Sequence, residues 1–155
     1  MLAAKLAAAL VAGIGYGLAC LAVLLAVAVP LLATIDGARQ PRVGDVATIG
    51  AGVVTSYALS AMFGVAVGAV LPNQVAAIVV MLAWSFVVES LVLLLAPAVG
   101  RWLPGNAASA LTDQDAGQLG GYELLPQWGG GLVLLAYVTV LAALGGRLLA
   151  RRDIT

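Results

Sequence analysis

The sequence contains almost no charge and no histidine. Of its 155 residues 9% are charged, seven basic and seven acidic, and the only cysteine is Cys20. A soluble domain carries about 25% charged residues, so these side chains cannot cover a water-facing surface. The zero net charge provides no basic excess for binding nucleic acid. One cysteine and no histidine exclude a disulfide framework and disfavour a zinc site or His-based acid–base catalysis.

Apolar residues make up 63% of the chain, and the mean hydropathy is +1.12. A helix needs about 20 mainly apolar residues to cross a bilayer, and the charged residues divide the sequence into such lengths. The uncharged stretch between Asp45 and Glu89 is too long for one span, and Pro72-Asn73 marks a turn inside it. We predict an all-α integral membrane bundle, a single transmembrane domain over residues 1–155. Its four spans are expected at about residues 6–33 (bent or ended near Pro30), 46–71, 75–96 and 128–146.

Residues 98–127 differ from the spans in composition and contain three of the seven acidic side chains. Trp102 and Trp128 bracket the segment, as is typical of aromatic side chains at a membrane–water interface. We expect a short interfacial or re-entrant helix here, within about residues 106–119, which begins at Asn106 or Ser109. The pair Asp113 and Asp115 is interpreted as turn or cap residues rather than as a cation site.

The distribution of Lys and Arg predicts the orientation. Four crossings place both termini on one side of the membrane, and that side then has four basic residues against three. Basic residues favour the cytoplasmic side, so we expect a multi-pass protein of the plasma membrane with both termini in the cytoplasm. The two groups are Lys5, Arg147, Arg151 and Arg152 on one side, and Arg39, Arg42 and Arg101 on the other.

Small residues recur every four positions along the second predicted span. Such residues let helix backbones approach closely, and dispersion then stabilises the contact in lipid. One interpretation is helix packing. The other adds that Ser56, Ser60 and the nearby Tyr57 line a substrate pathway. The stripe consists of Gly52, Ser56, Ser60, Gly64 and Gly68, and a shorter version in the first span consists of Gly13 and Gly17, with Gly15 on another face.

Glu89 is the only ionisable residue well inside a predicted span. A charged side chain at the bilayer centre costs about 2.5–3.5 kcal/mol on insertion scales. Ser85 lies one turn earlier on the same helical face, so the two residues predict a narrow polar stripe that faces protein or water. Glu89 either locks the third span to its neighbours by hydrogen bonds or contacts a substrate or proton.

The sequence contains no set of side chains typical of an enzyme. No two reactive side chains lie together in the spans, and no G-x-x-x-x-G-K-[ST] loop is present. We therefore expect no catalytic residues, no metal ligands and no cofactor.

The order of features resembles the permeases of ABC-2 type transporters from actinobacteria. In residues 62–80, a Gly-rich helix end is followed by a turn, Leu71-Pro72-Asn73-Gln74, and then by an Ala-Ile-Val run. This run resembles the junction of the fourth and fifth helices of that family. The other matching segments are Ala3-Ala4-Lys5-Leu6, Trp84 through Glu89, Pro97, Gly100-Arg101-Trp102-Leu103-Pro104-Gly105 and Arg151-Arg152-Asp153-Ile154-Thr155.

The resemblance implies the transmembrane subunit of an exporter of a hydrophobic or amphiphilic substrate. It implies a separate ATPase subunit, a second permease copy, and short re-entrant helices that close the exit side over residues 101–127. Family members usually have six helices, and this chain matches only the last four, so we expect it to be N-terminally incomplete. Pro72 also stands where the family turn often carries Arg. The alternative is a non-transporting structural or regulatory membrane subunit.

Overall fold

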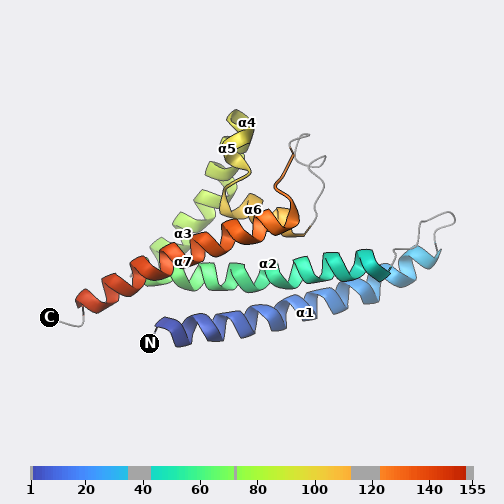
Figure 1. Cartoon of the computed structure of the whole chain (residues 1–155), viewed down its shortest axis with the longest axis horizontal. Helices are drawn as coiled ribbons and strands as arrows, with labels where there is room; N and C mark the ends of the chain where they lie inside the picture. Colours follow the sequence, from blue (N-terminus) through green and yellow to red (C-terminus); the bar gives the residue numbers. More distant parts are fainter. Residues whose placement is uncertain (1, 35–42, 72, 113–122, 153–155) are drawn as a thin grey trace.

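The computed structural model describes residues 2–34, 43–71, 73–112 and 123–152, and these form helices joined by short turns (Figure 1). The predicted all-α fold is confirmed, with four helices long and apolar enough to cross a membrane. Arg39, Arg42, Pro72, Asp113 and Asp115 lie outside the described residues. The elements are α1 (Leu2–Thr34), α2 (Val43–Val70), α3 (Gln74–Ala83), the π-helix η1 (Trp84–Val88), α4 (Glu89–Leu95), α5 (Pro97–Gly100), α6 (Pro104–Leu111) and α7 (Gln127–Arg152).

Helices α1 and α2 form an antiparallel pair that lies side by side along most of its length (Figure 1). Both Gly13 and Gly17 are buried in this seam. A Cβ at Gly13 would lie 2.7 Å from the Ala58 Cα, and one at Gly17 would lie 2.8 Å from the Val54 Cα. The glycines therefore allow backbone-to-backbone contact. Helix α1 also continues through Pro30 to Thr34, so this proline does not end the helix.

The α1–α2 seam gives a first prediction. Replacing Gly13 with Ala should loosen the pair, because the added methyl group overlaps α2 backbone and overpacking of this kind costs about 1–3 kcal/mol. Gly15, with nothing within 4 Å of its Cβ position, is the matched control. Thermal unfolding in detergent should show a lower midpoint for Gly13→Ala, whereas Gly15→Ala should be neutral or more stable, since Ala favours helix. Equal midpoints would contradict this packing.

Helix α7 packs along α2 through another close contact. A Cβ at Gly145 would lie 2.8 Å from the Ala69 Cβ, and the Phe63 and Tyr137 rings meet edge to face at 6.4 Å. The helix continues to Arg152, six residues beyond the end expected at 146. The candidate span within this helix ends at Leu148, close to the predicted end, and Gly145 is buried against α2.

The third span is a composite of α3, η1 and α4, and it diverges from α2 (Figure 1). Asn73 caps it, since its side-chain oxygen accepts from the Val75 and Ala76 backbone N–H groups at 3.0 and 3.3 Å. The turn predicted before this span is thereby confirmed. In η1, the Glu89 N–H donates to the Trp84 carbonyl five residues earlier. Such wide turns are rare and occur often at functional sites.

Helices α5 and α6 connect the third span to α7, and we call residues 97–111 the re-entrant segment. Helix α6 begins at Pro104, earlier than the predicted starts at Asn106 and Ser109. Proline is favoured in the first helical turn because its fixed φ is preorganised and it has no N–H to satisfy there. A buried hydrophobic cluster packs α6 between α2 and α7. Its members are Leu59, Ala107, Leu111 and Leu134.

Much of the surface is apolar. In the third span, Phe86 and Leu95 are 73% and 79% exposed. A monomeric soluble protein rarely exposes contiguous apolar surface on this scale, so lipid covers these side chains. The chain is an integral membrane protein. The N-terminal end of α1 and the C-terminal end of α7 lie on the same side of the structure (Figure 1), as four crossings require.

Candidate functional site

The short helix α6 is the centre of the candidate site, because polar side chains from three spans converge on its backbone. A helix leaves its first N–H groups and last carbonyl groups without partners of its own. A lipid environment offers no water to satisfy them, so protein groups must do so. In α6 most of these groups have a partner outside the helix or at its immediate ends.

Glu89 satisfies the N-terminal end. Its side chain is 5% exposed, and its carboxyl group accepts hydrogen bonds from the backbone N–H groups of Gly105 and Asn106. Pro104 has no N–H, and the Ala107 N–H donates to the Leu103 carbonyl at 2.8 Å. Residue Leu103, at the N-cap, has no side chain that could cap the helix. Glu89 therefore acts as a cap supplied by another helix, the role that Asp or Ser usually has locally.

The π-helical turn determines which residue shares the face of Glu89. Trp84, five residues earlier, directs its indole N–H to the Glu89 carboxyl group. In an α-helix residues four apart share a face, which is why the sequence predicts Ser85 as the partner. The extra residue of η1 changes this, and Ser85 is exposed instead.

Ser56 and Gln127 satisfy the other end of α6. The Ser56 hydroxyl donates to the Ala108 carbonyl at 3.3 Å, and the Gln127 Nε2 donates to the Leu111 carbonyl at 2.9 Å and to the Thr48 carbonyl at 3.1 Å. Between them, the Ser109 carbonyl accepts from the Thr112 backbone N–H at 3.1 Å and from the Thr112 hydroxyl at 2.9 Å. With Glu89 at the start and Gln127 at the end, α6 is tied to α4, α2 and α7.

Glycines provide the space in which α6 lies. A Cβ at Gly52 would overlap the Leu111 carbonyl oxygen, and one at Gly130 would overlap the Ala107 carbonyl oxygen. On α6 itself, a Cβ at Gly105 would overlap the Glu89 carboxyl group. Upstream, a Cβ at Gly100 would lie 2.6 Å from the Leu93 Cα, so α5 also contacts α4 through backbone.

Asn106 joins α5 to α6. Its side chain is 8% exposed and donates through Nδ2 to the Gly100 carbonyl at 2.9 Å. The backbone N–H of the same residue donates to the Glu89 carboxyl group. The re-entrant segment is thus connected internally as well as to the spans.

The structure separates the other residues predicted for a site. Tyr57 is 42% exposed and faces α1, where its ring lies 6.3 Å from that of Tyr16. Ser60 and Ser85 are exposed. Gly64 and Gly68 have nothing within 4 Å of their Cβ positions. At the other end of the stripe, α6 occupies the space beside Gly52. Ser56 is therefore covered by α6, whereas Ser60, one turn further along the same face of α2, is exposed, and Tyr57 faces α1.

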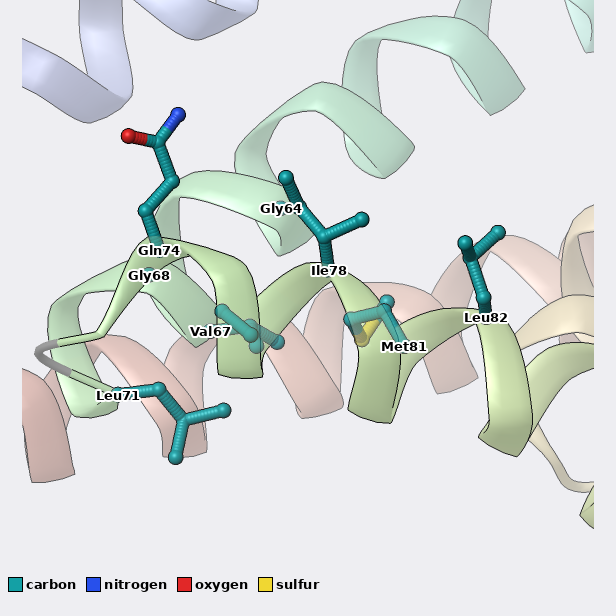
Figure 2. A pocket seen from close by; sticks show the side chains of 9 residues that line it. Gly64, Val67, Gly68, Leu71, Gln74, Ile78, Met81 and Leu82 are labelled. Atoms are coloured by element: carbon teal, nitrogen blue, oxygen red, sulfur yellow. The ribbon is translucent and has the colours of Figure 1, made fainter.

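Gly64 and Gly68 instead line an apolar groove between α2 and α3 (Figure 2). Its volume is about 490 Å³, and Gln74 at the start of α3 is its one polar side chain. Ile78 and Leu82 border it from α3 and are themselves half exposed. The residues that line it include no titratable group.

Sequence reasoning missed Gln127, Trp84 and Gly130 as parts of the site. The Pro104-Gly105 pair signals the start of α6, and the Gly129-Gly130-Gly131 run signals a close contact at the start of α7. No sequence signal identifies Gln127 or Trp84, because the first lies 16 residues from its acceptor at Leu111 and the second depends on η1.

The arrangement serves to hold a re-entrant helix. The described residues contain no group of three or more His, Cys, Asp and Glu side chains that could bind a metal ion. The polar atoms that converge on α6 are used to satisfy its backbone. The chain matches no model of a known family, no curated protein and no solved structure.

Proposed function

We propose that the chain is the membrane-spanning permease subunit of an ABC-2 type exporter that moves a hydrophobic or amphiphilic substrate. In this proposal it lies in the plasma membrane with both termini in the cytoplasm. It is not itself an enzyme and works with a second permease copy and a separate ATPase subunit.

The observation that supports the proposal best is the re-entrant segment between the third and last spans. The sequence resemblance implies short re-entrant helices at this point, and α5 and α6 lie there. Because Glu89, Ser56 and Gln127 fasten α6, it can close one end of a pathway without exposing its backbone to lipid. The order of the sequence segments that resemble the family is the other support, and it belongs to the same resemblance.

The proposal predicts a stable complex with an ATPase. The tagged chain, purified in mild detergent from membranes of its host, should retain a protein that contains a Walker A loop, because transport energy must come from a partner. The vesicle efflux of a fluorescent amphiphile should then require both proteins and ATP. Purification without any such ATPase, together with unchanged efflux after deletion of the gene, would contradict the proposal.

A non-transporting structural or regulatory subunit is the second candidate, and one observation favours it. In the described part of the chain, Ser56 and Glu89 hold α6, while Ser60 and Ser85 are exposed separately. Two of these four polar residues thus serve to hold α6, as a structural role would require. The efflux assay distinguishes the two candidates, because a structural subunit would bind partners without adding ATP-dependent transport.

A further inference from the structure

We propose that the π-helical turn η1 gives Glu89 two alternative registers, one that fastens the start of α6 and one that releases it. A π-helical turn contains one more residue than the same stretch of α-helix, and ordinary α-helix precedes and follows it here in α3 and α4. The wide turn can therefore move along the helix by one turn without a change in chain length. Such a move would carry it past Glu89.

The sequence supplies a partner for Glu89 in each register. In the observed register the Glu89 N–H donates to the Trp84 carbonyl, and the Trp84 indole faces the Glu89 carboxyl group. In the other register the Glu89 N–H would donate to the Ser85 carbonyl. The Ser85 hydroxyl would then lie one turn before Glu89 on the same face.

Ser85 has no visible role in the observed register. It is exposed, and its hydroxyl makes none of the side-chain hydrogen bonds found in the described residues. A polar side chain in that position gains a partner when Glu89 turns towards it. Replacing Ser85 therefore tests whether Glu89 has two registers or only one.

Little packs against η1 to oppose the change. Four of its five residues are exposed, including Phe86 at 73% and Val87 at 54%. The contacts that fix the segment lie beyond it, at Glu89 and at Gly100 against Leu93. When Glu89 turns away, the N–H groups of Gly105 and Asn106 lose their acceptor, while Ser56 and Gln127 still hold the far end of α6. The start of α6 then opens and uncovers Ala107, the residue after Asn106, which is fully buried in the observed structure.

A role for this change in opening an export pathway rests on the proposed function. The register change itself does not, so its test uses no ATPase and no substrate. The probe is the thiol of Ala107→Cys, in a chain whose only native cysteine is removed by Cys20→Ala. Ala107 is 0% exposed and packs against Leu59 and Leu134, so N-ethylmaleimide reaches it only when the start of α6 lifts.

The experiment measures the rate of labelling in liposomes for three variants of this reporter chain. Ser85→Ala removes the partner of the released register, and labelling should slow by about fivefold, the effect of one net hydrogen bond. Trp84→Phe removes the indole donor of the fastened register but keeps an aromatic ring, and labelling should accelerate by about fivefold for the same reason. Ser90→Ala, at an exposed serine next to Glu89, is the matched control and should label at the parent rate.

Opposite shifts at two adjacent residues are the signature of two registers. If Ser85→Ala labels at the rate of the parent and of Ser90→Ala, Glu89 has one register and the proposal is wrong, whatever Trp84→Phe does. A slower rate in Trp84→Phe would also overturn it. Failure to find an ATPase partner would leave these rates unchanged, so the two proposals fail separately.

Discussion

Replacing Glu89 with Leu should unseat α6 while the third span still inserts into the membrane. Leucine inserts more favourably than glutamate, by about 3 kcal/mol or more at a helix centre. The loss is in assembly, because the Gly105 and Asn106 N–H groups are left without an acceptor. Each buried unsatisfied donor costs about 1–3 kcal/mol. We expect the midpoint of thermal unfolding in detergent to fall by about 10 °C.

Glu89→Gln is the matched control for this prediction. The amide has nearly the same shape, and its oxygen can accept from the same two N–H groups. We expect it to retain most of the stability, with a loss of about 1 kcal/mol, since an acceptor without charge forms a weaker bond. If Glu89→Leu were as stable as the parent, Glu89 would not hold α6.

Replacing Gly52 with Ala should displace the other end of α6. The added methyl group would overlap both the Leu111 carbonyl oxygen and the Gln127 Nε2, so the hydrogen bond between them cannot keep its geometry. We expect a loss of about 3 kcal/mol, from overpacking of about 1–3 kcal/mol plus the broken bond. The measurement is again thermal unfolding. A second measurement is the rate at which N-ethylmaleimide labels Ser56→Cys in a chain that also carries Cys20→Ala, and this rate should rise as the end of α6 lifts.

Gly64→Ala provides the control, since Gly64 lies on the same stripe of α2 and faces open space. Alanine favours helix over glycine by about 1 kcal/mol, so this variant should be as stable as the parent or more so. A similar loss in both variants would show that α2 is sensitive to any substitution. It would contradict the claim that Gly52 leaves the space for the end of α6.

The spans could be predicted from sequence because charge is excluded from lipid. Lys5, Asp45 and Arg147 stand near their boundaries, and the expected ranges overlap the helices closely. The last candidate span ends at Leu148, close to the predicted end at 146, while helix α7 continues to Arg152. The hydrophobic pattern predicts the span but not how far the helix extends beyond it.

The site could be predicted only in part, since its geometry depends on contacts between elements. Glu89 stands out as the one carboxyl group inside a span, but the residues it contacts, Gly105 and Asn106, belong to a different element. The start of α6 was placed too late because the expected cap was a local side chain, whereas the actual cap comes from α4. The pairing of Trp84 with Glu89 follows from an extra residue in η1, for which the sequence has no periodic signal.

The central claim is that side chains of three spans hold α6 in place. Hydrogen exchange of the peptide that contains residues 104–111, measured by mass spectrometry in lipid nanodiscs, tests it most directly. The Gly105 and Asn106 amides should exchange as slowly as those of α2 and α7 in the parent and in Glu89→Gln, and at least about tenfold faster in Glu89→Leu, the effect of about 1.4 kcal/mol. Fast exchange of these amides in the parent, or the same slow rate in Glu89→Leu, would contradict the claim.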